Sequence, residues 1–358
     1  MVVSDLHLGT RLGADVLAQA SVRARLTDAV EGADRLVLLG DLLELRHGPL
    51  RDALVAAREP LSEIGAALGP DGEVVVLAGN HDHRLIDDFA RRRELAPAPV
   101  ALAPETAVDW REGEALEEVA RLLAPARVRA AYPGVWLRDD VYATHGHYLD
   151  LHLTVPTLER LATGVMRRVV ALDGTGPTSI EDYETVLAPL YAWIDALAQR
   201  VAPERGALMH GGSVRGWQAL AGGRDLRRRG RLRARVIAAA WPVAIAGCNR
   251  LGLGPLRPAL STSELRRAGL EAIGEVVART GVDATWVIFG HTHRAGPLAA
   301  DDPGPWRAPS GTRLLNCGCW VREAALQGRN PSSSPYRPGF CVVLQDDGPP
   351  ALVDLLDG

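Results

Sequence analysis

The sequence predicts an α/β protein, because short apolar runs rich in β-branched residues alternate with stretches of helical period along its 358 residues. Hydrophobic residues make up 47% of the chain, which is enough to build a large buried core. A second observation is that five of the apolar runs each end in polar residues that can bind a metal ion. We therefore expect a large α/β domain with its chemistry at the ends of its strands.

Five candidate strands carry this pattern, and each is short, apolar and followed by a turn. They are residues 2–3 followed by Asp5 and His7, 36–39 followed by Asp41, 74–77 followed by Asn80, 141–144 followed by His145, and 286–289 followed by His291 and His293. If these strands are neighbours in one or two packed sheets, the polar residues converge on one edge, where open α/β proteins place their sites.

Helical period fills the intervals between the strands. Residues 15–30 and 50–68 repeat apolar side chains with a helical spacing, and 314–316 and 340–344 are further strand candidates. The interval from His147 to Thr285 is too long for a simple connection and carries several helical faces. We predict a main domain formed by 1–150 and 281–358, interrupted by an inserted helical cap at 151–280.

Composition limits the partners and the compartment. The formal net charge is −4, which by itself indicates neither a nucleic-acid nor a membrane partner. No run approaches the roughly 18 apolar residues that a membrane span needs, so we expect a cytoplasmic protein. Four cysteines in such a chain are expected to be reduced thiols, and Cys317 and Cys319 lack the further ligands of a zinc site.

The polar residues at the strand ends form a set suited to divalent metals. Together they offer two carboxylates, one amide oxygen and four imidazoles without a thiolate, which suits Mn, Fe, Zn or Co. Seven side-chain ligands are too many for one catalytic metal with an open position. They suit two metal ions that share a bridging carboxylate.

Five blocks containing these residues resemble, in order, the motifs of calcineurin-like metallophosphoesterases. The blocks are Ser-Asp-Leu-His-Leu-Gly at 4–9, Gly-Asp-Leu-Leu-Glu at 40–44, Gly-Asn-His-Asp at 79–82, His-Gly-His at 145–147 and Gly-His-Thr-His at 290–293. The resemblance implies a layered α/β/β/α sandwich with a dinuclear metal centre. One metal would take Asp5, His7 and His293, the other Asn80, His145 and His291, with Asp41 bridging.

The resemblance also implies catalytic roles for two further residues. His81 would not bind a metal, but would stabilise the transferring phosphoryl oxygens or protonate the leaving alkoxide. Asp82 would orient the His81 ring, as carboxylates commonly do for histidines. The implied activity is the hydrolysis of a phosphodiester or pyrophosphate, lipid- or nucleotide-linked, by a metal-activated water.

Two other functional classes stay open. The same centre could serve a nuclease that acts on DNA or RNA, and the fold could serve as a non-catalytic scaffold, although all seven ligands and His81 are present. The Gly-Asp-Leu-Leu-Glu block and a basic cap are also similar to UDP-diacylglucosamine pyrophosphohydrolases. Those proteins often carry Arg where His81 stands and lack the long insertion.

Several other polar residues have two interpretations each. Glu44 either supports the metal ligands from outside or is an exposed carboxylate in the first turn of a helix, and His147 either meets substrate or bonds a loop carbonyl. The remaining histidines are expected to be structural or on the surface: His47, His83, His152 and His210. Asn316, in a block after the last His pair, is expected to give structural support.

An arginine-rich segment precedes an apolar run in the predicted cap. Seven arginines lie between 224 and 235, and residues 236–246 are mainly apolar. Such a segment can contact an anionic membrane surface or a lipid phosphate, which would place the protein at the inner face of the membrane. We favour the alternative, in which the apolar part packs inward and the arginines are its solvated flank.

Overall fold

A computed structural model of the chain describes residues 1–11, 14–170, 176–200, 241–258, 261–328 and 330–357. Its strands are β1 Val2–Val3, β2 Arg35–Leu39, β3 Glu73–Leu77, β4 Glu105–Val108, β5 Arg127–Arg138, β6 Val141–Thr144, β7 Trp286–Phe289, β8 Arg313–Asn316, β9 Phe340–Val343 and β10 Ala351–Asp354. Its α-helices include α1 Ala20–Val30, α2 Leu50–Leu68, α3 Asp87–Glu94, α4 Ala115–Leu122, α5 Leu158–Val170, α6 Ile180–Arg200, α9 Thr262–Arg279 and α10 Ala324–Gln327. Short 3₁₀ turns lie at η1 Leu45–His47, η2 His83–Ile86, η3 His147–Leu151, η4 Gly304–Trp306 and η5 Pro331–Ser333.

The described strands form one mixed sheet. Its order is β10-β9-β1-β2-β3-β5-β6-β7-β8, with β4 paired to β5 outside this path. The strands β1, β2, β3 and the first part of β5 are parallel, and so are β6, β7 and β8. Antiparallel pairing occurs between β5 and β6 and at the β9–β10 edge. The α/β class is confirmed.

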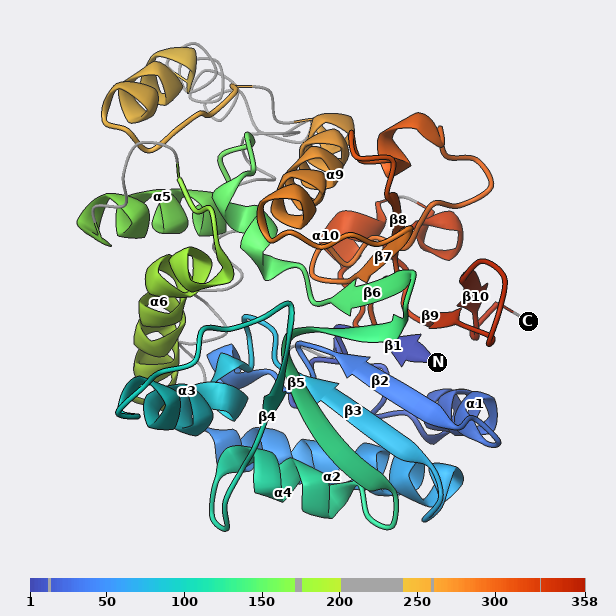
Figure 1. Cartoon of the computed structure of the whole chain (residues 1–358). Coiled ribbons are helices and arrows are strands. Elements are labelled where there is room, and N and C mark those ends of the chain that lie inside the picture. Colours follow the sequence, from blue (N-terminus) through green and yellow to red (C-terminus); the bar gives the residue numbers. More distant parts are fainter. Residues whose placement is uncertain (12–13, 171–175, 201–240, 259–260, 329, 358) are drawn as a thin grey trace.

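The predicted layered α/β/β/α arrangement is wrong, because the sheet is continuous and nearly closed into a barrel. The cause is β5, whose 12 residues pair with β3 in their first part and with β6 after Gly134. A bulge between Trp136 and Arg138 adds to the bend. The loop after β8 then reaches the loop after β1, where Trp320 donates its backbone N–H to the carbonyl of Asp5 at 2.9 Å. Figure 1 shows β5 extending between the two halves of the sheet.

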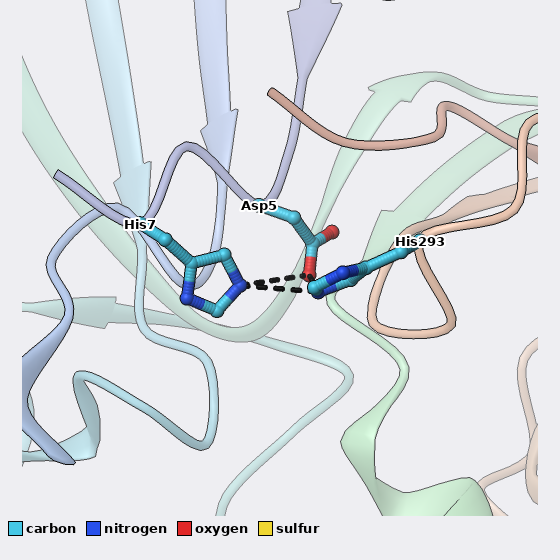
Figure 2. A group of neighbouring side chains, drawn as sticks. All are labelled: Asp5, His7 and His293. Carbon is cyan, nitrogen blue, oxygen red and sulfur yellow. Dashed lines mark hydrogen bonds and ion pairs between the residues drawn. The ribbon is translucent and has the colours of Figure 1, made fainter. Parts of the chain in front are cut away.

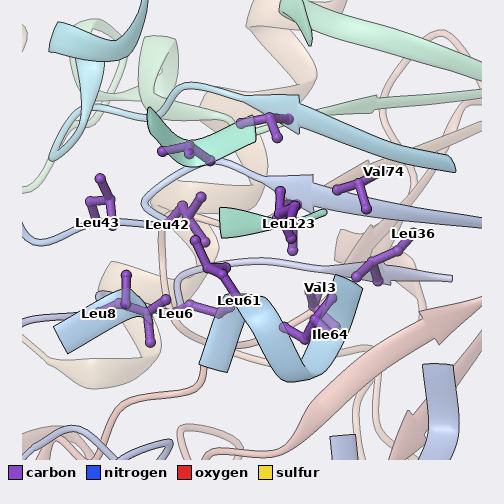
Figure 3. Close-up of a cluster of buried hydrophobic side chains, with 14 of the residues drawn as sticks. Val3, Leu6, Leu8, Leu36, Leu42, Leu43, Leu61, Ile64, Val74 and Leu123 are labelled. Atoms are coloured by element: carbon purple, nitrogen blue, oxygen red, sulfur yellow. The ribbon is translucent and has the colours of Figure 1, made fainter. Parts of the chain in front are cut away.

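The curled sheet encloses one apolar core and is covered outside by two others. The inner core takes side chains from almost every strand of the barrel, including Val37, Val75, Val135 and Ile288. Because side chains alternate along a strand, the other face of β1, β2 and β3 points outward and packs on α2. Figure 3 shows Val3, Leu36 and Val74 in this outer cluster, beside side chains of α2 such as Leu61 and Ile64.

On the other half of the barrel, the outer cover comes from η3, α6 and α9. Their side chains share a buried cluster with β6 and β7, in which Tyr183 of α6 and Ile273 of α9 accompany Val287 and Phe289. The helical period predicted at 50–68 corresponds to α2, whereas α1 begins only at Ala20. The residues before α1 form a turn, in which Asp15 accepts a hydrogen bond from the Ala18 N–H at 3.2 Å.

The division into a domain and a cap at 151–280 stays a prediction. The arginines between 224 and 235 lie outside the described residues, so the two interpretations of that segment both stay open. Among the helices that the structure describes, none is long and apolar enough to cross a membrane.

Candidate metal centre

The structure brings all seven predicted ligands together at one edge of the sheet. The parallel strands end at the same edge, and each ligand lies in the first residues after its strand. Among the described residues, three groups of His, Asp and Glu side chains have ligand atoms within 4.8 Å of one another: Asp5, His7 and His293; His7, Glu44 and His81; and Asp41, His145 and His291. These buried groups could hold metal ions.

The first group joins the loops after β1 and β7. Figure 2 shows Asp5, His7 and His293 pointing toward one another. The Nε2 atoms of His7 and His293 are 3.1 Å apart, and His293 Nε2 lies 3.2 Å from Asp5 Oδ1. Asp5 is fully buried and the two rings are nearly so. Lone-pair donors that converge in this way suit a cation between them.

The third group, formed by Asp41, His145 and His291, surrounds the Asn80 amide. Its oxygen lies 3.0 Å from His291 Nδ1 and 3.2 Å from His145 Nε2. It also lies 3.2 Å from Asp41 Oδ2, which is itself an acceptor. An amide oxygen surrounded by other lone pairs is poorly served by hydrogen bonds alone, whereas a cation would satisfy all of them. The donor set therefore fits a metal ion here too.

Asp41 belongs to the third group and also lies near His7 of the first group. Its Oδ2 atom is 3.3 Å from His145 Nε2 in one group and 3.7 Å from His7 Nε2 in the other. Gly79 permits this arrangement, since an added Cβ would come within 2.2 Å of Asp41 Oδ1. The geometry thus allows one carboxylate to reach both groups.

The backbone at this edge is strained. In the described chain the non-glycine residues with positive φ are Asp5, His7, Asp41, His291 and His293, at 45–62°. Residues other than glycine rarely adopt this left-handed backbone conformation. Each such residue destabilises the fold by about 1–3 kcal/mol, which the surrounding structure must offset. Every one of these strained residues is a predicted ligand, which indicates that the loops are shaped for the site.

The four ligand imidazoles also share a second feature. Each holds an oxygen acceptor on the ring nitrogen that faces away from the centre, at 2.9–3.0 Å: His7 to Glu44, His145 to the Leu39 carbonyl, His291 to Asp150 and His293 to Glu323. Such partners fix the tautomer and aim the other nitrogen inward, as in metal sites. All four rings therefore turn their other nitrogen toward the centre.

Three of these outer acceptors could not be assigned from sequence alone. Glu44 had two interpretations, and the structure supports the first, because the residue is 3% exposed and contacts His7. Asp150 was missed, although a carboxylate between Leu149 and Leu151 is a signal of a buried charge. Glu323 was missed because it follows the last motif by 30 residues, and nothing in its neighbourhood marks it.

His81 contacts the carboxylate of Glu44. His81 Nδ1 lies 2.9 Å from Glu44 Oε2, whereas both oxygens of Asp82 accept hydrogen bonds from backbone amides. Those amides belong to Gly79 and to residues 41–43, so Asp82 ties the loop after β2 to the loop after β3. Glu44 is therefore placed to orient the His81 ring, and the catalytic roles of His81 and Asp82 stay predictions.

Burial and charge set the protonation of the centre. Although burial opposes it, contacts with Asp5 and Glu44 raise the pKa of His7 to about 10, and the charges of Asp41 and Asp5 raise the pKa of His145 to about 9. Burial and then the charge of Arg46 lower the pKa of His81 to about 3. The carboxylates thus stabilise positive charge at the ligand rings, while His81 stays neutral.

The remaining polar residues near the site are structural in their contacts. Asn316 donates to the Gly290 carbonyl and to Thr292 at 2.9 Å, which supports the loop that carries the last His pair. His147 is buried and its Nε2 lies 3.1 Å from the Tyr132 hydroxyl. His83 is buried between Asp87 and Glu184, whereas His210 lies outside the described residues.

Comparisons of the chain with protein-family models, with curated proteins and with solved structures found no match.

Proposed function

We propose that the protein is a metal-dependent phosphoester hydrolase of the calcineurin-like type, with a dinuclear centre. One observation carries the proposal: four imidazoles, each fixed by an outer oxygen, turn their inner nitrogens toward shared carboxylates. A structural salt-bridge network has no need for this common orientation. The order of the five sequence motifs adds support, since it matches the order in that family.

Two groups of ligands would each bind one divalent ion, which would be Mn, Fe, Zn or Co. Asp5, His7 and His293 would hold one ion, and Asn80, His145 and His291 the other, with Asp41 shared. When bound, such ions polarise a phosphoryl group and lower the pKa of a water toward neutrality. The strained loops keep the ligands in place before any substrate arrives, which favours electrostatic preorganisation.

His81 is suited to move a proton beside this centre. Glu44 holds its Nδ1 side, so Nε2 is the atom that can take up a proton and then pass it to the oxygen of the leaving group. Burial and then the charge of the nearby Arg46 lower the pKa of His81, which keeps the ring neutral in the free protein. An anionic ester bound next to Arg46 would offset that charge and let the ring take up a proton more readily.

The direct test is a metal-reconstitution assay. The chain is stripped with a chelator, restored with Mn, Fe, Zn or Co, and assayed on a phosphomonoester, a phosphodiester, a cyclic nucleotide, a nucleotide-lipid pyrophosphate and single-stranded DNA. We expect hydrolysis of a phosphodiester or pyrophosphate that returns only with metal. Hydrolysis that survives chelation would overturn the proposal.

A matched pair of variants checks the ligand assignment. His145→Gln should lose bound metal, measured by elemental mass spectrometry, because it removes a predicted ligand. His152→Gln should keep it, because His152 bonds the Tyr183 hydroxyl and belongs to none of the three groups. Equal metal content in both variants would contradict the assignment.

A further inference from the structure

A pocket lies beside the candidate centre, between the loops of the sheet edge and α6. On the sheet side it is lined by Arg46, Asn80 and His81, and on the α6 side by Tyr191, Ile194 and Asp195. Asn80 and His81 thus belong both to the proposed centre and to this pocket. A ligand atom in the pocket would therefore lie beside Asn80 and His81 of the proposed centre.

Two hydrogen-bond donors at this pocket have no partner among the described residues. They are the Nε–H of Arg46 and the hydroxyl of Tyr191, and both atoms are buried. Tyr191 is 5% exposed, so its hydroxyl has no access to bulk water in this arrangement. Buried donors are nearly always paired, and an exception beside a catalytic site calls for a ligand with an acceptor oxygen.

Among the side chains that line the pocket, one positive charge is not offset by a carboxylate. Asp195 is paired with Arg84 at 3.0 Å, so these two charges offset each other. Arg46 contacts the backbone carbonyl of Asn80 at 3.2 Å, and it forms no ion pair with any described carboxylate. One guanidinium charge and two free donors are suited to a phosphoryl oxygen.

The α6 side of the pocket is held firmly in place. Two turns before Tyr191, the buried carboxylate of Glu184 accepts hydrogen bonds from the hydroxyls of Tyr132 and Tyr148, and it lies 3.3 Å from His83 Nε2. We call Glu184, Tyr132, Tyr148 and His83 the α6 anchor. Because the anchor joins α6 to β5, η3 and η2, it fixes where Tyr191 lies relative to Arg46 and His81.

Building on the proposed function, we propose that Arg46 and Tyr191 bind an anionic oxygen on the group esterified to the scissile phosphate. The site would then favour diphosphates, in which a second, charged phosphoryl group is attached to the bridging oxygen. It would disfavour esters in which the group attached to that oxygen carries no charge. The two residues would be specificity determinants, separate from the metal ligands.

Two substrates that differ only in the leaving group test this preference. Both are assayed with the metal-restored full chain: di(adenosine-5′) diphosphate, which releases AMP, and adenosine 5′-(p-nitrophenyl phosphate), which releases p-nitrophenol. Tyr191→Phe and Arg46→Gln should each lower kcat/KM for the diphosphate at least about tenfold and change that for the p-nitrophenyl ester less than about threefold. Equal losses on both substrates would overturn the proposal.

A binding measurement separates this proposal from the proposed function. Imidodiphosphate, which resists hydrolysis, is titrated calorimetrically into the full chain with chelator present. Tyr191→Phe should weaken binding about tenfold, whereas Tyr183→Phe, another buried tyrosine of α6 whose hydroxyl bonds His152, should not. Unchanged binding in Tyr191→Phe would overturn the subsite, even if the chain hydrolyses phosphoesters. Weakened binding without hydrolysis of any ester would overturn the proposed function and keep the subsite.

Discussion

The candidate centre and the α6 anchor are both buried and polar, but they are built in different ways. The centre takes its side chains from the residues directly after β1, β2, β3, β6 and β7, and strained backbone holds them. The anchor gathers side chains from four separate elements around the single carboxylate of Glu184. We infer that a side chain of the centre can be removed without unfolding the protein, whereas the anchor fails as a unit.

The largest effect is expected at His81. The change His81→Ala should lower kcat about 10²–10⁴-fold, because it removes the positioned proton donor, and it should leave metal content unchanged. Turnover is measured on the best substrate of the panel, and metal content by elemental mass spectrometry. A variant with undiminished kcat would end the assignment, and loss of metal would show that His81 supports the ligands instead.

Asp82 is expected to be an exception to the difference between the centre and the anchor. It follows a strand, as the ligands do, but its contacts are structural, so its removal should destabilise the fold. Asp82→Ala leaves the backbone amides of Gly79 and residues 41–43 without their acceptor in a buried place. We expect the free energy of unfolding to fall by about 3–5 kcal/mol in a denaturant titration. Asp88→Ala, a change at a carboxylate whose side chain is 42% exposed, should cost less than about 0.5 kcal/mol. Equal stability of the two variants would contradict the structural role of Asp82.

The anchor should make stability depend on pH. Although burial lowers it, hydrogen bonds to Asp87 and Glu184 raise the pKa of His83 to about 9. The folded state therefore binds this proton more tightly than the unfolded state, in which the pKa is about 6.5. The stabilisation is complete below pH 6.5 and declines as the pH rises to 9, by about 3 kcal/mol at most.

A difference measurement isolates this contribution. Denaturant titrations of the wild type and of His83→Gln are compared from pH 6 to 10. His145, whose pKa is also raised to about 9, titrates in both proteins and cancels in the difference. We expect the gap between the two proteins to narrow over pH 6.5–9. A gap that stays constant would mean that His83 packs without its charge.

The contrast between the two regions also explains what could be read from sequence. The ligands were predictable because each follows a short apolar strand within a few residues, so a local pattern fixes a spatial one. Glu184 and Tyr191 carry no such pattern, since the partners of Glu184 lie in β5, η2 and η3, far away in the chain, and Tyr191 meets the pocket only through the fold. They are ordinary members of an amphipathic helix until the fold places them.

The sheet shows the same limit at a larger scale. Alternating strands and helices predicted the α/β class correctly, and the period at 50–68 located α2. The closure of the sheet depends on β5, which continues for 12 residues through Pro133 and Gly134. Those two residues normally interrupt strands, so local propensity argued against one long strand, and tertiary pairing with both β3 and β6 overrode it.

The smallest expected effect concerns Asp150, which lies in η3 beside the anchor residue Tyr148 but contacts the ligand His291 at 3.0 Å. Asp150→Asn should weaken metal affinity about 10–100-fold, because the amide orients the imidazole less strongly. The affinity is measured by competition with a chromogenic chelator, and Glu112→Gln, at an exposed carboxylate, serves as the control. If Asp150→Asn leaves the pH dependence of stability unchanged, the centre and the anchor are independent. If Asp150→Asn alters both the metal affinity and the pH dependence of stability, η3 couples the centre to the anchor. The two regions would then not be independent.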